Sequence, residues 1–157
     1  MISKTKRPLS DEERRKLRHV FPSLLFRSRR TVAQQELDGG MAEVLDFIVN
    51  RVWDMNGCRP PCCPHIYLFH VGETEFVYAE SWTAFNDVSG QFPRRRMRIV
   101  RSPLTKRILS ADVEGEVLPL EDNPFDPATD YFDHGAECEV LKEEDMSEEA
   151  RSVLAAT

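Results

Sequence analysis

Seven basic residues and no acidic residue lie between positions 94 and 107. We call them the arginine stripe: Arg94, Arg95, Arg96, Arg98, Arg101, Lys106 and Arg107. If residues 94–101 form a strand, alternate side chains project from one face roughly 7 Å apart, which is comparable to the spacing of phosphates along a nucleic-acid strand. A guanidinium group donates two parallel hydrogen bonds to a phosphate or a carboxylate. The stripe therefore predicts a surface that binds a partner through charge.

Four interpretations of the arginine stripe are open from the sequence. The stripe could follow a nucleic-acid backbone or contact an acidic protein partner. It could charge an exposed edge strand against aggregation, or it could be covered by the acidic C-terminal part of the same chain. The chain has a net charge of −6, whereas nucleic-acid-binding domains are usually basic. This balance favours a protein partner over nucleic acid.

Cysteine and histidine supply a second candidate site, because thiolates and imidazoles are typical zinc ligands. Pro60 and Pro61 would hold Cys58 and Cys62 too far apart to share one ion. The better set combines two pairs of ligands that lie about seventy residues apart in the sequence: Cys62 with His65, and His134 with Cys138. The simpler interpretation is that these cysteines pack as small buried hydrophobic residues.

Carboxylates offer weaker signals for chemistry. Glu80 shares a predicted strand face with aromatic residues, where burial could raise its pKa and allow it to act as an acid. Asp126, Asp130 and Asp133 crowd one loop beside His134, and their oxygens suit calcium or magnesium. The spacing is not that of an EF-hand. No set of nucleophile, base and orienting group can be assembled from the sequence.

Helices are predicted early in the chain. Ser10 and Glu13 form a capping box, which predicts a helix from Asp11 to about Val20. Apolar residues recur at helical spacing between Met41 and Met55, which predicts a second, amphipathic helix. Phe47 would project from the polar face of that helix. We expect the N-terminal segment to cover it, while a partner contact is the alternative.

Strands are predicted to follow. Residues 65–71 and 75–82 are rich in β-branched and aromatic residues and flank a short turn, so they predict a hairpin. Residues 95–101 predict a third strand. A second hairpin is predicted with strands at residues 105–113 and 116–120 and a turn at 114–115. A late strand is predicted at residues 136–141, and a short helix capped by Ser147 follows it. The predicted fold class is α+β, with N-terminal helices on an antiparallel sheet of about five to six strands and a short C-terminal helix.

The length of 157 residues predicts a single domain, 1–157. Its charge is segregated: residues 1–30 carry ten basic and three acidic residues, and the tail 142–157 is acidic. No apolar run is long enough to span a membrane. The start of the chain lacks the apolar core of a signal peptide, and the cysteines do not suggest a disulfide scaffold, so we expect a cytoplasmic location.

These features predict a non-enzymatic interaction protein, of the adaptor, inhibitor or immunity type, that binds a macromolecular partner through segregated basic and acidic surfaces. The expected contact surfaces are residues 94–107 and the acidic segment 121–149. The alternative is a nucleic-acid-binding accessory factor with a zinc staple. A third hypothesis is a metal-dependent enzyme that uses Glu80 or the aspartate loop.

Overall fold

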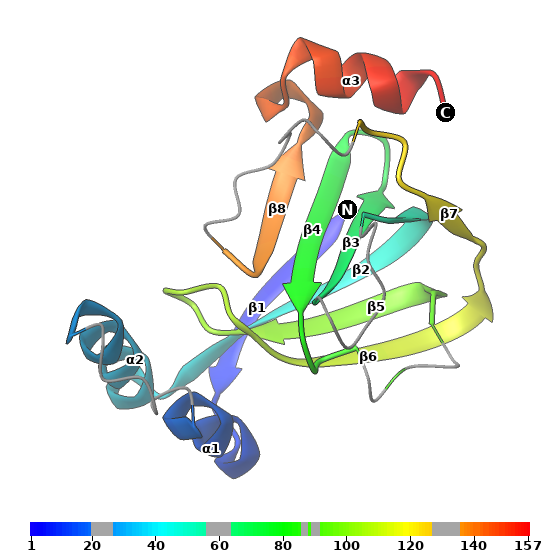
Figure 1. Ribbon diagram of the computed structural model, residues 1–157. Coiled ribbons are helices and arrows are strands. Elements are labelled where there is room, and N and C mark those ends of the chain that lie inside the picture. The colour runs from blue at the N-terminus through cyan, green and yellow to red at the C-terminus, as the bar shows by residue number, and fades with distance from the viewer. Residues whose placement is uncertain (20–26, 56–63, 86–87, 89–91, 127–135) are drawn as a thin grey trace.

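The computed structural model is dominated by one mixed sheet of eight strands (Figure 1). It describes residues 1–19, 27–55, 64–85, 88, 92–126 and 136–157. The strands are β1 (Ile2–Pro8), β2 (Met41–Asp54), β3 (His65–Val71), β4 (Glu75–Ser81), β5 (Arg94–Arg101), β6 (Ile108–Val117), β7 (Leu120–Asp122) and β8 (Cys138–Lys142). The helices are α1 (Asp11–His19), α2 (Arg27–Gly39) and α3 (Glu148–Ala155), with a 3-10 turn, η1, at Glu143–Asp145.

The predicted fold class was wrong in its main feature. The body of the protein is a sheet of eight strands, in which all pairings but one are antiparallel. The three helices are short and do not form a layer that covers the sheet. Three of the strands, β1, β2 and β7, were absent from the sequence prediction. Residues 2–8 form β1 within the basic N-terminal segment, and residues 41–54 form β2 where a helix was predicted.

Strand β2 is shared by two halves of the sheet. Its first part, residues 41–48, pairs with β1 on one side and with β5 on the other, and β6 follows β5. Its last part, residues 49–54, pairs with β3 and, in parallel, with β7, and β4 and β8 follow β3. We call these the first and second half-sheets. In Figure 1, β5 and β6 run across the direction of β3, β4 and β8.

A β-bulge in β2 explains why its sequence resembles a helix. The register with β3 moves by two residues on β2 but by one on β3 between Val49 and Arg51, so Asn50 is the extra residue. Before the bulge Leu45, Phe47 and Val49 point into the main core. After the bulge the phase changes, and Trp53 points to the opposite face. Apolar residues from both faces therefore combine into a spacing close to the helical one.

The residue that did not fit the predicted helix, Phe47, belongs to the core. It is 2% exposed and lies edge to face with Phe69, with ring centroids 5.9 Å apart. Its neighbour Ile48 points outward and is 47% exposed. The alternation of Leu45, Phe47 and Val49 is the signal typical of a strand that the helical interpretation overlooked.

The predicted second hairpin, with strands at residues 105–113 and 116–120, was also wrong. Residues 108–117 form the single strand β6, which continues through the expected turn. Gly115 has φ of +92°, and the register with β5 shifts between Arg94 and Arg96. The glycine thus forms a bulge within a continuous strand, because a left-handed residue bends a strand without reversing it.

Elements with strong local signals were predicted correctly. The capping box that begins α1 is present, since the Glu13 amide donates to Ser10 Oγ at 3.2 Å and the Ser10 amide donates to the Glu13 carboxylate at 2.8 Å. Strands β3 and β4 form the predicted hairpin, with Gly72 at φ +66° in the turn. Ser147 caps α3 by accepting a hydrogen bond from the Ala150 amide.

The main hydrophobic core lies between the two half-sheets. Inward-pointing residues from six strands meet there, and they include Phe47, Phe69, Val77, Ile99, Ala111 and Cys138. A second cluster covers the other face of the second half-sheet, where α3 contributes Ala150 beside Trp53 and Phe76. The acidic tail is thereby placed on the outside of the second half-sheet.

Replacing Phe47 with Ala tests the strand assignment of β2. Because Phe47 is buried, Phe47→Ala should lower the free energy of unfolding by about 3–5 kcal/mol. Ile48→Ala, the matched control, should cost less than about 1 kcal/mol because half of that side chain is already in water. Urea unfolding followed by tryptophan fluorescence measures both. The reverse order of the two effects would support the helix and contradict the strand.

Candidate interaction surface

Strand β5 divides the arginine stripe between two faces. Arg96 and Arg98 point outward and are about half exposed. Met97, which lies between them, and Ile99, which follows Arg98, are buried in the core. Arg101 points inward with Met97 and Ile99 and is only 3% exposed. The seven basic residues therefore do not form one continuous surface.

The two exposed arginines share one carboxylate. Asp46 on β2 lies beside both of them in the sheet, with Arg96 Nε 3.0 Å from Oδ1 and Arg98 Nη2 2.8 Å from Oδ2. Hydrogen bonds from Arg96 hold the pKa of Asp46 below its ordinary value, although partial burial opposes this, and Arg98 adds to the lowering. Asp46 is therefore ionised at neutral pH and offsets part of the positive charge of this face.

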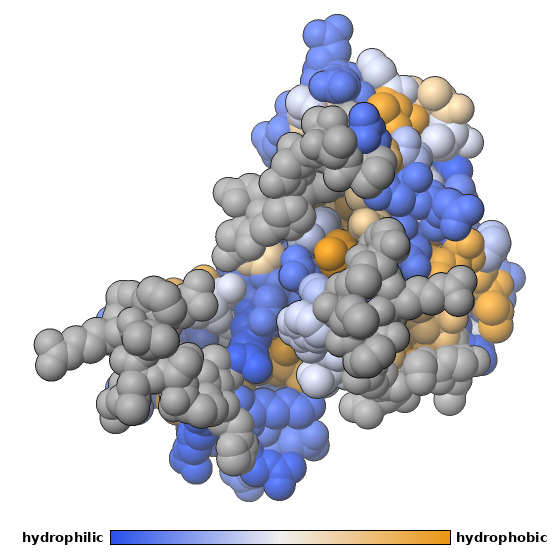
Figure 2. Space-filling model, in the orientation of Figure 1, coloured by the Kyte–Doolittle hydropathy of each residue, from blue (hydrophilic) through white to orange (hydrophobic). Residues whose placement is uncertain are grey.

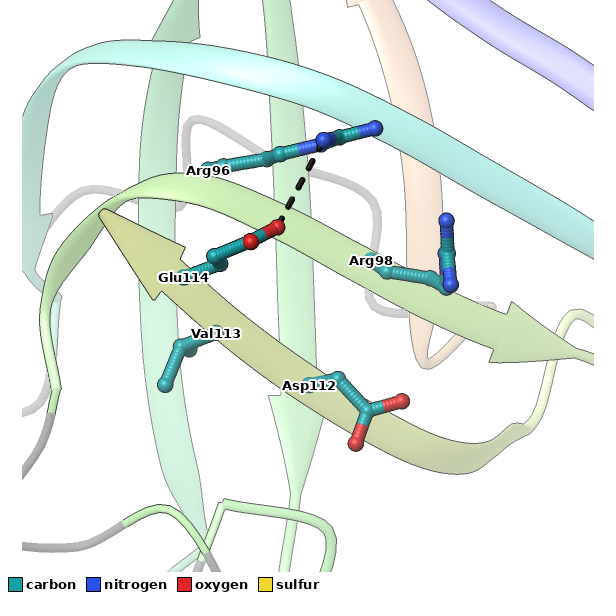
Figure 3. Close-up of a pocket in the computed structure, with 5 residues that line it drawn as sticks. All are labelled: Arg96, Arg98, Asp112, Val113 and Glu114. Carbon is teal, nitrogen blue, oxygen red and sulfur yellow. Dashed lines mark hydrogen bonds and ion pairs between the residues drawn. The ribbon is translucent and has the colours of Figure 1, made fainter.

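Acidic residues of β6 complete the pattern. Glu114 lies opposite Arg96 in the register and pairs with it at 3.5 Å, and Asp112 lies opposite Arg98. We call Asp46, Arg96, Arg98, Asp112 and Glu114 the charged face. Figure 3 shows four of these residues around a shallow pocket of about 210 Å³, together with Val113. The face offers alternating donors and acceptors on three adjacent strands, which suits a partner carrying charges of both signs.

Arg101 serves the interior of the protein. Its Nε donates to Glu43 Oε2 at 2.6 Å, and its Nη1 donates to the backbone carbonyl of Cys138 at 2.5 Å. Burial alone would raise the pKa of Glu43, but the hydrogen bond and charge of Arg101, with Lys106 and Lys4 nearby, bring it below its ordinary value. Arg101, on β5, thus connects Glu43 on β2 with the Cys138 carbonyl on β8 across the core.

Three of the four remaining stripe residues also have partners in the fold. Arg94 donates to the Gly115 carbonyl at 2.6 Å, and Arg95 lies 3.3 Å from Glu116. Lys106 lies 3.4 Å from Glu43 and has φ of +58° in the loop between β5 and β6. The stripe therefore consists mainly of side chains that bind neighbouring parts of the same sheet.

The loop after β5 is held by an acidic side chain that the sequence did not single out. Glu36 on α2 is 4% exposed, and its Oε1 accepts from the backbone amides of Leu104 at 2.9 Å and Thr105 at 2.8 Å. The Thr105 hydroxyl adds a third donor. Three donors compensate for the burial of this carboxylate and fix the loop against α2.

The acidic tail was one expected cover for the arginine stripe. The carboxylates that pair with Arg95, Arg96, Arg98 and Arg101 come instead from β2 and β6. The tail packs on the outer face of the second half-sheet through α3. Burial of Ala150 in that cluster holds α3 in this position.

The described residues include two of the four predicted zinc ligands, His65 and Cys138. Cys62 and His134 lie outside the described residues, as do Asp130 and Asp133 of the aspartate loop. His65 stacks on Tyr67, and Cys138 is buried in the main core, where desolvation raises the pKa of its thiol to about 11. Within the described ranges no three histidine, cysteine or acidic side chains converge as a metal site would require. The four-residue set remains a prediction.

Glu80 lies near a second carboxylate that the sequence did not indicate. Tyr78 donates to Glu80 Oε2 at 3.0 Å, and the Ile108 amide donates to Glu137 Oε2 at 3.0 Å. Burial raises the pKa of Glu137, and the charge of Glu80 raises it further, while the Ile108 amide and Arg107 oppose the rise. Glu137 therefore connects the approach to β8 with the start of β6.

Comparisons with known proteins gave no relative. No family model, no curated protein and no solved structure matches this chain. Among the helices of the described ranges, none is both long and apolar enough to cross a membrane. The interpretation of the candidate surface therefore depends on its geometry.

The raised pKa of Glu137 predicts a dependence of stability on pH. The folded protein favours the protonated carboxyl, so the contribution of Glu137 is fully present below its ordinary pKa of 4.5 and is lost as pH rises through the raised value. Glu137→Gln keeps an oxygen for the Ile108 amide but cannot ionise. The variant should be more stable than the native chain at neutral pH, and its stability should change less between pH 4 and pH 8.

Urea unfolding across that pH range measures the effect. Glu139→Gln is the control for the same carboxyl-to-amide change on β8. If Glu137→Gln destabilised the protein at neutral pH, the carboxylate would be needed in its charged form, contrary to the burial argument.

Proposed function

We propose that this chain is a non-enzymatic interaction protein that binds another protein through the charged face. The observation that carries the proposal is the arrangement of Arg96 and Arg98 on either side of Asp46, with Glu114 and Asp112 on the adjacent strand. Exposed charges of both signs, held by strands in a fixed order, favour a partner with the complementary order of charges. Such an order gives specificity that a uniform basic patch lacks.

The segregation of charge along the chain supports the same proposal. Exposed basic residues, including Arg15 and Arg18, lie on α1, while the exposed acids Glu143, Glu144 and Glu148 lie on η1 and at the start of α3. Separated charges of this kind steer an approaching partner and speed association. The expected association is therefore fast and sensitive to salt.

Recognition of nucleic acid is the second candidate, and one observation favours it. Arg96 and Arg98 are exposed on one strand face, at a spacing near that of successive phosphates. Asp46 weighs against it, because a carboxylate between the two arginines would repel a phosphate backbone. The charged face thus favours a protein partner.

Removing the two exposed arginines separates these candidates. Arg96→Ala/Arg98→Ala should weaken binding of the protein partner by about tenfold or more. It should leave the fold intact, because ion pairs exposed to water contribute little to stability. Isothermal titration with the partner recovered from the host measures the change. Lys142→Ala/Arg151→Ala, which removes two basic residues of β8 and α3, is the matched control.

Asp46→Asn distinguishes the two classes of partner. This variant releases both arginines, so it should weaken the protein complex but strengthen binding of a 20-nucleotide single strand. Tight binding of that oligonucleotide by the native chain, lost in Arg96→Ala/Arg98→Ala, would replace the proposed function with the nucleic-acid alternative.

A further inference from the structure

Strand β6 ends the sheet on the side of the first half-sheet. Among the described strands it pairs with β5 alone. The Ser102 amide donates to the Arg107 carbonyl, and the Ile108 amide instead donates away from β5 to Glu137. In an antiparallel pair the backbone groups of successive residues alternate between the two sides. Along β5 this alternation leaves Ile99 facing β2, so its partner Ala111 on β6, and Val113 after it, direct their backbone groups away from the sheet.

A groove of about 510 Å³ runs along this outer edge of β6. One wall comes from α1, through Arg15 and Lys16, and the other comes from the segment after β4, through Thr83 and Ala84. Residues 107–112 of β6 and its approach form the floor. The groove therefore gives access to the backbone of Ala111, and Val113 lies two residues further along the same strand.

One backbone carbonyl on this edge, that of Leu109, already accepts a hydrogen bond of the kind that a neighbouring strand would donate. Lys16 Nζ donates to the Leu109 carbonyl at 2.8 Å, and the same ammonium group lies 3.3 Å from Glu12. A lysine at this position limits pairing of the exposed edge with unsuitable strands. A segment that supplies its own backbone amide, and a carboxylate for Lys16, could take the place of these contacts.

The charge around the groove favours an acidic occupant. Three basic residues line it, Arg15, Lys16 and Arg107, against the acidic Glu12 and Asp112. Arg18, one turn further along α1, adds an exposed positive charge near that wall. Trp82, 58% exposed, directly precedes Thr83, and tryptophan is among the residues that contribute most at protein interfaces.

We propose that the edge of β6 accepts an extended acidic segment of a protein partner, which joins the sheet as an added strand. Its backbone would pair with the outward groups of Ala111 and Val113, while its carboxylates would lie against Arg15 and Arg107. Main-chain pairing would supply affinity and the charges would supply selectivity, as in other cases of strand addition. This inference rests on the proposed protein-binding function and assigns that function a second contact beside the charged face.

Two synthetic peptides test the inference on the full chain. The first alternates Glu and Thr over eight residues with blocked ends, so that its carboxylates share one face of the added strand, and the second replaces each Glu with Lys. Amide hydrogen exchange and ¹⁵N chemical shifts are recorded during each titration. The acidic peptide should slow exchange of the Ala111 and Val113 amides at least several-fold, and the basic peptide should not.

Variants locate the contact. Arg15→Glu/Arg107→Glu should weaken binding of the acidic peptide about tenfold or more, and Lys142→Glu/Arg151→Glu is the matched control, with binding unchanged. Arg15→Glu alone, on the exposed surface of α1, keeps the test valid if the double variant does not fold. Equal effects of the two peptides, or shifts confined to Asp46, Arg96, Arg98 and Glu114, would overturn the inference.

The same data separate this inference from the proposed function. A partner that depends on Arg96 and Arg98 but leaves exchange at Ala111 and Val113 unchanged would overturn the added strand and leave the protein-binding function standing. Protection of the two amides that increases with protein concentration in the absence of peptide would assign the edge to a second copy of the chain, which also overturns an acidic partner segment.

Discussion

Strand β2 has neighbours on both sides along most of its length, and it belongs to both half-sheets. Its first part sets the register of β1 and β5, and its last part sets that of β3 and β7. The bulge at Asn50 changes which face is buried, so the same strand serves the main core before the bulge and both clusters after it. The placement of the charged face depends on this arrangement, because Asp46 reaches Arg96 and Arg98 only while β2 and β5 keep their register.

Local signals made part of the fold predictable. The capping box of α1, the β3–β4 hairpin and the Ser147 cap each depend on residues within a few positions of one another. Only the alternation of Leu45, Phe47 and Val49 indicates strand β2, because the residue inserted after it shifts the period of two into a pattern close to that of a helix. The continuous course of β6 was hidden for a related reason, since Gly115 permits either a turn or a bulge.

The partners of the basic residues in the candidate site could not be predicted from the sequence. The arginine stripe was recognisable as a run of like charge, but its partners are distant in the sequence: Asp46 lies 50 residues from Arg96, and Glu43 lies 58 residues from Arg101. Sheet pairing alone brings them together. The consequence for function is large, because a stripe that appeared to be an uncompensated basic surface is divided into a buried connection and an exposed face of alternating charge.

We propose that the charged face binds a protein rather than nucleic acid. Native mass spectrometry of the untagged chain, isolated gently from its own host, tests it most directly, because one spectrum distinguishes a bound protein from a bound nucleic acid. We expect a defined complex with another protein that dissociates as the ammonium acetate concentration is raised. A spectrum showing the chain bound to nucleic acid, or only as an unaccompanied monomer, would contradict it.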